Sequence, residues 1–342
     1  MMRRYTLVFT FFFLLFSACN ADRNLPDISA IDADVKIERF DQDISGLKPT
    51  DVFDKNNIWQ EQYADFYTDY LYYMLEIGDP ADSARSTRLL AEVIENKDFK
   101  ALSAAVAKKY PSLKTEEEEL TTAFKYLKYY FPGYQLPRFV SFFSGFAVQV
   151  PIGENYIGIG LDMFLGSDSE FYPALVKSIP MYISRRFTPE NITSRVVETV
   201  LRQELIEKKD TDINTLQHMV YEGKVLLALD SILPAMSDSL KIGYTSEQLL
   251  WAEKYQSEIW SWFLEENLLY STDHQRIQKY FTEAPFTAEL GENNESAPKL
   301  GVYLGWKLVK KYMEQNPQIT LIELLGNEDA QQILNDSKFK GK

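Results

Sequence analysis

Apolar residues recur at three- and four-residue spacing along most of this chain, and this period constrains the fold more than any other feature of the sequence. Leu120, Phe124 and Leu127 show the spacing, and Pro132 and Gly133 end the segment. A period near 3.6 residues is typical of amphipathic α-helices. The same pattern predicts helices over residues 51–77, 82–95, 97–110, 115–131, 189–209, 212–232, 246–270, 298–315 and 328–336.

The segment 138–163 departs from the helical period. Residues 139–143 and 156–161 are β-prone, and residues 152–155 between them are typical of a turn. We therefore expect a hairpin that belongs to a small sheet. The chain has no fixed-period repeat and no internal linker. The sequence predicts a mainly α (α+β) fold, with residues 35–342 as a single, mainly helical domain.

The N-terminal residues form a targeting segment. Arg3 and Arg4 precede an apolar run of twelve residues, 5–16. A helix needs about 20 apolar residues to span a bilayer, so the run is too short to do so. Its length is typical of the apolar region of a signal peptide. The run is followed by small residues and then by Cys19, the only cysteine of the chain.

This arrangement resembles a bacterial lipobox, in which the cysteine is lipidated and becomes the new N-terminus. Phe16 departs from the usual leucine. An ordinary secretory signal peptide is the alternative. The lipobox predicts that residues 1–18 are a signal peptide and that Cys19 carries the lipid. Residues 19–34 would then be a polar tether, and the lipid would attach the protein to the inner or outer membrane, outside the cytoplasm.

The composition excludes several classes of protein. The formal net charge is −14, and it becomes −16 when residues 1–18 are removed with Arg3 and Arg4. Binding to DNA or RNA requires a cationic surface, so we expect no nucleic-acid partner. One cysteine excludes a disulfide framework and any site with several cysteine ligands. Two histidines exclude a histidine-rich metal site.

The helix predicted around Val196 and Val200 carries polar residues inside its apolar arc. At 100° per residue, Gln203, Glu204 and Glu207 fall in the same arc as the two valines. Unpaired buried carboxylates cost several kcal/mol. These residues therefore require charged partners, a water-filled cleft, or a helix end that already lies in solvent. The charged face of this helix falls elsewhere, at Arg195, Glu198 and Arg202.

The spacing of these residues matches a degenerate metallopeptidase motif. In His-Glu-x-x-His, two histidines bind zinc and the glutamate is the general base. Glu204 occupies the position of the base, but Gln203 and Glu207 replace the histidines, and Glu222 occupies the position of a third ligand. Such oxygen donors suit Ca²⁺, Mg²⁺ or Mn²⁺ better than zinc. We interpret Gln203, Glu204, Glu207 and Glu222 as a vestigial cleft without catalytic residues, and we predict no bound metal and no cofactor.

Five strings of residues resemble the gliding-motility lipoprotein GldB family, over residues 35 to 338. The resemblance implies a role in gliding motility and in the protein-secretion machinery linked to it. It also implies a distant relation to predicted zinc-dependent, zincin-like proteases. The strings are Val35–Asp41, Tyr130–Gly133, Tyr156–Asp162, Tyr221–Lys224 and Gly301–Lys307.

We expect a non-catalytic lipoprotein that binds a protein or peptide of an envelope assembly, with its lipid in the membrane. One alternative is an active metallopeptidase with an unconventional oxygen-rich metal site. Another is a surface lipoprotein that binds glycans or nutrients through exposed aromatic side chains. Aromatic residues at helical spacing, such as Tyr70 and Tyr73, are assigned to the core rather than to such a surface.

Overall fold

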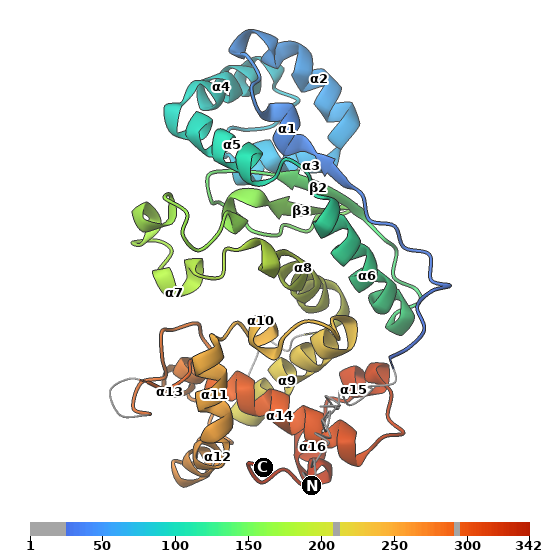
Figure 1. Cartoon of the computed structure of the whole chain (residues 1–342), viewed down its shortest axis with the longest axis vertical. Coiled ribbons are helices and arrows are strands. Elements are labelled where there is room, and N and C mark those ends of the chain that lie inside the picture. Colours follow the sequence, from blue (N-terminus) through green and yellow to red (C-terminus); the bar gives the residue numbers. More distant parts are fainter. Residues whose placement is uncertain (1–24, 208–212, 291–294) are drawn as a thin grey trace, which may run out of the picture.

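The computed structural model of the chain describes residues 25–207, 213–290 and 295–342. The predicted signal peptide and Cys19 lie outside these residues. Helices precede and follow a small sheet (Figure 1), which confirms the mainly helical α+β fold. No helix in the described part of the chain is long and apolar enough to cross a membrane.

The sheet consists of three parallel strands in the order β1 (Ile37–Arg39), β2 (Arg138–Phe142) and β3 (Tyr156–Gly160). Ile37 is aligned with Phe139, and Phe139 with Ile157. Every residue of β3 is buried. Parallel sheets are usually covered on both faces, and the apolar composition of β2 and β3 fits such a position.

The predicted hairpin is wrong, because β2 and β3 run in the same direction. After β2, the chain first runs beside β3 in the opposite direction and then turns to form β3. In this return segment, the carbonyls of Gln149 and Pro151 accept hydrogen bonds from the amides of Gly160 and Gly158, at 2.9 and 2.8 Å. The predicted turn at 152–155 therefore joins this return segment to β3, with an antiparallel bridge between Ile152 and Ile157, and does not join residues 139–143 to β3. β-propensity identified the strands, but it carries no information on their relative direction.

Among the described residues, seven α-helices lie between β1 and β2 or just after β3 in sequence. Those at 83–95, 97–109 and 114–130 match predicted segments to within one residue at each end, whereas those at 40–44 and 181–184 were not predicted. The predicted helix over 51–77 is interrupted at Ala64, whose φ is +46°. The elements are α1 (Phe40–Ile44), η1 (Pro49–Asp51), α2 (Val52–Tyr63), α3 (Asp65–Asp69), the π-helical turn η2 (Tyr70–Met74), α4 (Ser83–Glu95), α5 (Lys97–Lys109), α6 (Lys114–Tyr130) and, after the sheet, α7 (Met181–Ser184).

An aromatic cluster forms the core of the N-terminal part. Phe40 lies at its centre and is fully buried. Edge-to-face ring pairs of this kind add to the apolar area that they bury. Tyr73 was assigned to this core, but it is 70% exposed, which corrects that assignment. The rings within 4.9–5.9 Å of Phe40 are those of Trp59, Tyr63, Phe66, Tyr67 and Tyr70.

The C-terminal part is built around the crossing of α9 (Thr215–Ile232) and α14 (Leu300–Gln315). At this crossing, a Cβ on Gly305 would lie 1.9 Å from the Met219 carbonyl oxygen, and a Cβ on Gly223 would lie 2.2 Å from that of Gly305. Only glycines permit this approach. Two of the strings behind the family resemblance, Tyr221–Lys224 and Gly301–Lys307, therefore meet in space.

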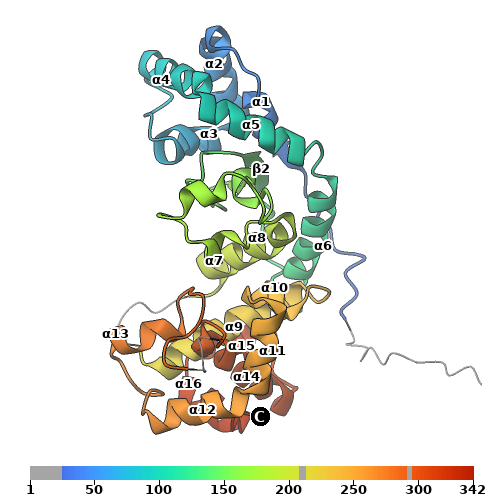
Figure 2. The ribbon, with the colours of Figure 1, turned by 60° about the vertical axis from the view of Figure 1, so that its left-hand side comes forward.

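The remaining elements connect the sheet to this helix pair and pack around it (Figures 1 and 2). α8 continues into a π-helical turn, η6, that ends the helix. The elements are η3 (Leu161–Phe164), η4 (Tyr172–Leu175), η5 (Pro189–Asn191), α8 (Ile192–Val200), η6 (Leu201–Leu205), α10 (Asp238–Ile242), α11 (Ser246–Lys254), α12 (Gln256–Glu265), α13 (His274–Ile277), η7 (Gln278–Tyr280), α15 (Leu321–Gly326) and α16 (Ala330–Ser337).

The extended segment before β1 runs beside α6 in the opposite direction (Figures 1 and 2). The Lys128 ammonium donates a hydrogen bond to the Asp32 carbonyl oxygen at 2.7 Å. Nearer the start of α6, the Val35 amide donates to the Thr121 hydroxyl at 2.9 Å. From β1 toward its N-terminus, the chain therefore follows α6 as far as the C-terminal end of that helix.

Candidate functional site

A cavity of about 170 Å³ lies between α8, α9, α10 and the residue that precedes α14. Charged side chains make up most of its wall, so we call it the ion-lined cavity. Seven charged residues line it: Arg186, Glu198, Arg202, Glu222, Lys241, Glu283 and Lys299.

Arg202 joins two carboxylates from different helices. Its Nε donates to Glu198 at 2.9 Å, and its Nη2 donates to Glu222 at 2.7 Å. Glu198 lies one turn before Arg202, and both face Glu222 of α9. His218 lies one turn before Glu222, with 3.7 Å between its Nε2 and a Glu222 oxygen. The guanidinium therefore occupies the space that these acidic side chains share.

The charges determine the protonation of this group. Burial by itself raises the pKa of Glu198, but the guanidiniums of Arg195 and Arg202 outweigh burial and lower this pKa to about 2. Burial also raises the pKa of Glu222, and hydrogen bonds from His218 and Arg202 reverse the effect, so this pKa is lowered. Both glutamates are therefore ionised at neutral pH.

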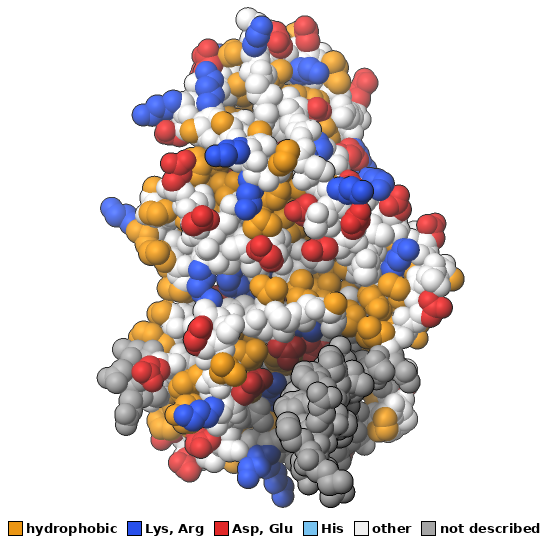
Figure 3. All heavy atoms as spheres, viewed as in Figure 1, with side chains coloured by type: hydrophobic (Ala, Val, Ile, Leu, Met, Phe, Trp, Pro, Cys, Tyr) orange, Lys and Arg blue, Asp and Glu red, His pale blue; other side chains and the backbone are white. Residues whose placement is uncertain are grey.

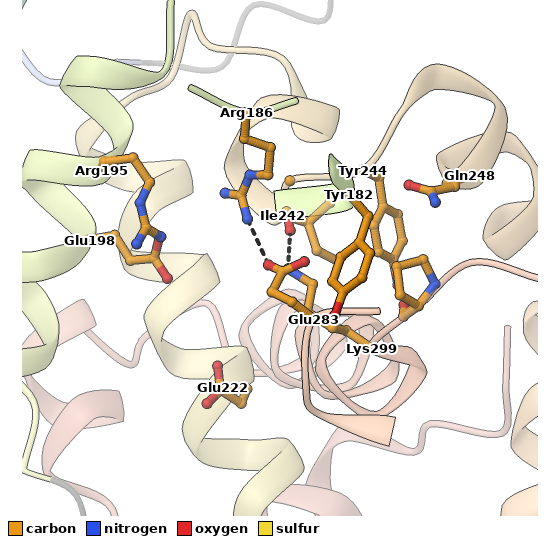
Figure 4. A network of polar contacts seen from close by, with 12 residues as sticks. Tyr182, Arg186, Arg195, Glu198, Glu222, Ile242, Tyr244, Gln248, Glu283 and Lys299 are labelled. Atoms are coloured by element: carbon orange, nitrogen blue, oxygen red, sulfur yellow. Dashed lines mark hydrogen bonds and ion pairs between the residues drawn. The ribbon is translucent and has the colours of Figure 1, made fainter. Parts of the chain in front are cut away.

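Glu283 forms a second cluster on the same wall (Figure 4). Its Oε1 accepts hydrogen bonds from Arg186 at 2.7 Å and from Lys299 at 2.6 Å. The Lys299 ammonium also donates to the Ile242 carbonyl oxygen at 2.7 Å. Two buried atoms, the Nε of Arg186 and the Oε2 of Glu283, have no hydrogen-bond partner among the described residues.

The second cluster buries two cationic side chains, Arg186 and Lys299, and burial disfavours their charged forms. Burial lowers the pKa of Arg186 and of Lys299, and Glu283 only partly offsets this effect. Buried charges are stable only when opposite charges and hydrogen bonds compensate for the lost water. The cavity can therefore hold the sheet part and the C-terminal helices in one arrangement, because its charges come from both.

The structure does not bring the four predicted cleft residues together. Gln203 and Glu204 are exposed, and the Oε2 of Glu204 accepts a hydrogen bond from the Tyr134 hydroxyl at 2.7 Å. Glu207 is exposed and lies at the edge of another cavity. Only Glu222 lines the ion-lined cavity. The regular helix ends at Val200, and the π-helical turn that follows places Gln203 and Glu204 on the surface, with Glu207 two residues beyond its end.

Sequence reasoning missed the residues that do face Glu222. Arg195, Glu198 and Arg202 were placed on a charged face away from the apolar arc, but this face is turned toward α9. One signal was available in the sequence. The i, i+4 pair of Glu198 and Arg202 lies next to buried valines, so its carboxylate and guanidinium can neutralise each other on entering the interior. The partner residues Arg186 and Glu283 are 97 positions apart and carry no local signal.

A second cavity, of about 350 Å³, lies on the other side of α9. Its wall is mainly apolar, so we call it the apolar cavity. The ammonium of Lys224, on its wall, donates to the carbonyl oxygens of Leu325, at 3.2 Å, and Asn327, at the end of α15. α9 thus contributes to the walls of both cavities. Tyr221 and Lys224 line the apolar cavity, and Glu222 lines the ion-lined cavity.

In the part of the chain that the structure describes, no group of three or more His, Cys, Asp or Glu side chains is arranged to hold a metal ion. Glu222 and Glu198 point at a guanidinium, and Glu204 points at a tyrosine hydroxyl. The carboxylates of the ion-lined cavity are thus held in ion pairs.

The chain was compared with known proteins. The model of the family described as gliding motility protein GldB matches residues 21–341, which is nearly the whole chain. No curated protein matches the chain, and no solved structure does so.

Proposed function

Because the chain belongs to the gliding motility protein GldB family, we propose that it is a non-catalytic binding component of an envelope assembly for gliding motility and for the protein secretion linked to it. Family membership implies a gliding motility lipoprotein. In our proposal, the lipid on Cys19 attaches it to the inner or outer membrane, outside the cytoplasm. Its partners are other envelope proteins of the assembly.

One observation supports a non-catalytic role, the engagement of Arg202 by both Glu198 and Glu222. A hydrolytic metal site needs ligands for the ion and a general base within reach of the bound water. The guanidinium already engages Glu222, the predicted third ligand, together with Glu198. In this proposal, residues 35–342 act as one zincin-like domain, and Arg202 holds Glu222 in an ion pair instead of leaving it to a metal ion.

Glu204 is the residue that tests this proposal most directly, because the sequence placed it in the position of a general base. We expect Glu204→Gln, introduced in place of the natural copy in a gliding bacterium, to leave colony spreading unchanged. Glu258→Gln is the matched control, since Glu258 is also exposed but lies on α12, outside the predicted cleft and both cavities. Loss of spreading in Glu204→Gln alone, at normal protein level, would contradict the non-catalytic assignment.

Cys19→Ala tests the attachment to the membrane. We expect the variant protein to leave the membrane fraction and spreading to be lost. Membrane fractionation, together with the mass of the mature N-terminus, measures the attachment separately from motility. A variant that stays in the membrane fraction would show that the lipid on Cys19 is not the attachment.

A further inference from the structure

We propose that the apolar cavity binds an acyl chain of the lipid on Cys19, so that the protein shields part of its own lipid from water when that lipid is outside a bilayer. This inference rests on the proposed lipidation and adds a lipid site to the folded part of the molecule. The site lies on the opposite side of α9 from the ion-lined cavity.

The wall of the apolar cavity has the chemistry of an acyl-chain site. Ile206, Val220 and Ala330 are buried in it, and Ile322 is 48% exposed. These side chains come from two parts of the chain about 100 residues apart, 206–220 and 322–330, so the wall exists only in the folded protein. The Lys224 ammonium is directed at the carbonyl oxygens that end α15. Covering apolar surface of this kind with an apolar chain removes it from water and is therefore favourable in free energy.

The volume matches part of one acyl chain. The cavity measures about 350 Å³. A water molecule occupies about 30 Å³ in the liquid, and a methylene group is of similar size. The cavity therefore holds roughly ten methylene groups, which is more than half of a sixteen-carbon chain.

The path of the N-terminal segment leads toward this cavity. Asp32 is bonded to Lys128, three residues before Phe131, and Phe131 lines the cavity. Three residues of helix correspond to about 4.5 Å. Figure 3 shows hydrophobic side chains gathered on the surface over this end of α6. The extended segment therefore brings the chain to the side of the molecule on which the cavity lies.

The tether is long enough to place Cys19 at the cavity. The described chain begins at Leu25, six residues after Cys19. Six extended residues span about 20 Å. The acyl chain adds its own length to this reach.

Charge favours the protein's own acyl chain over a free fatty acid. Two carboxylates line the cavity, Glu207 and Glu328, against one ammonium, Lys224, so the charge of the lining opposes the carboxylate of a fatty acid, as does the formal net charge of −14 of the whole chain. An acyl chain joined to the N-terminal cysteine carries no carboxylate. The occupant that fits both the walls and the edge is therefore a neutral, covalently attached chain.

The first experiment tests the occupant in the complete protein. Cells are grown with a photoactivatable sixteen-carbon fatty acid, so that the lipid on Cys19 carries the reactive group. After irradiation, mass spectrometry locates the cross-links within the protein. We expect cross-links to α9, α15 and α16, and at least a tenfold loss of these cross-links in Ala330→Trp, whose indole fills the cavity. Leu264→Trp is the control, because Leu264 is exposed on α12.

The outcomes separate this inference from the proposed function. A labelled protein that cross-links only to membrane lipids or to other proteins overturns the cavity inference and leaves the lipid attachment intact. A protein that carries no label, although Cys19 is present, overturns both. Val220→Phe is a second variant that fills the same cavity, and it replaces Ala330→Trp if that protein does not fold.

A second measurement examines the cavity without the attached lipid. The full-length Cys19→Ala protein is titrated with monododecanoylglycerol, a neutral twelve-carbon lipid, and with dodecanoate, by calorimetry below their micelle concentrations. We expect one molecule of the neutral lipid to bind, with at least tenfold weaker binding of dodecanoate and at least tenfold weaker binding by the variant that also carries Ala330→Trp. Absence of binding, or equal binding of both lipids, would contradict the proposed chemistry of the site.

Discussion

Buried carboxylates in two regions of the molecule have pKa values that are shifted in opposite directions. In the ion-lined cavity, Glu198, Glu222 and Glu283 lie beside guanidinium or ammonium groups, and the pKa of each is lowered. At the carboxyl end of β3, Asp162 is fully buried, and its pKa is raised to about 6 by burial, which outweighs the hydrogen bonds from backbone amides.

The difference lies in the type of donor. The Oδ2 of Asp162 accepts hydrogen bonds from the amides of Ser144, at 3.1 Å, and Phe146, at 2.7 Å. Its Oδ1 has no hydrogen-bond partner among the described residues. Two backbone amides thus do not compensate for the burial of the Asp162 carboxylate. At Glu198, the guanidiniums of Arg195 and Arg202 do compensate for burial. A buried carboxylate in this fold therefore favours ionisation where a cation reaches it, from neighbouring turns of the same helix at Glu198 and from other segments at Glu222 and Glu283.

The largest expected effect comes from removing the cation that two carboxylates share. Arg202→Met retains much of the side-chain volume but leaves Glu198 and Glu222 without their common partner, so that only Arg195 remains beside Glu198 and only His218 beside Glu222. Breaking one side of a buried ion pair costs about 3–5 kcal/mol. We expect a loss of about 4 kcal/mol in the free energy of unfolding, measured by urea denaturation at pH 7.

Arg88→Met is the matched control for this variant. Arg88 pairs with Glu92 at 3.0 Å, but both side chains are more than half exposed. Exposed pairs of this kind contribute about 0–1 kcal/mol, so we expect a loss of less than about 1 kcal/mol. Equal losses in the two variants would show that the ion-lined cavity behaves as a solvated surface.

The pH dependence of stability sharpens the comparison, because the two carboxylates predict slopes of opposite sign. The pKa of Asp162 is raised from 3.8 to about 6 in the folded state. The folded protein therefore binds more protons than the unfolded chain between about pH 4 and 6, and the Asp162 contribution to stability falls as pH rises through this window. The loss corresponds to about 3 kcal/mol.

The pKa of Glu198 is lowered from 4.5 to about 2 in the folded state. Its contribution to stability is present above about pH 4.5 and is lost as pH falls toward 2, again by about 3 kcal/mol. Unfolding free energies of Asp162→Asn and Glu198→Gln, each measured against the natural protein from pH 3 to 7, isolate the two groups. Slopes of the same sign in the two difference curves would refute the contrast between the regions.

The smallest effect on stability is expected at Glu204, an exposed carboxylate that lies in neither region. Tyr134→Phe removes the hydrogen bond that the hydroxyl donates to Glu204 at 2.7 Å. Glu204 is exposed, so water replaces the lost donor, and we expect a loss of at most about 1 kcal/mol in urea denaturation. A loss as large as that of Arg202→Met would mean that Glu204 depends on a buried network.

Much of the secondary structure was predictable because helices follow a local rule. The apolar spacing predicted 97–110, 212–232 and 298–315, and the structure has α5, α9 and α14 within these segments, up to three residues shorter at one end. The predicted helix over 246–270 is two helices, α11 and α12, which meet at Tyr255. Apolar spacing continues across such a break and therefore does not reveal it.

The candidate site was predicted less well, because its partners are far apart in sequence. Glu222 was grouped with Gln203, Glu204 and Glu207 in the predicted cleft, but the structure places it on the wall of the ion-lined cavity, apart from them. Arg186 and Glu283 illustrate the limit. Each is an ordinary charged residue in the sequence, and only their approach to 2.7 Å makes them part of a site.

The sequence by itself determined the helical segments, the two main strands, the single cysteine after an apolar run and the family to which the chain belongs. These features depend on local periodicity and on short ordered strings. Tertiary structure decided the parallel direction of β2 and β3, the face of α8 that turns inward, and the carboxylates that meet a cation. The reason is energetic. Burial of a charge is unfavourable until a distant residue supplies the opposite charge, and only the folded chain brings the two together.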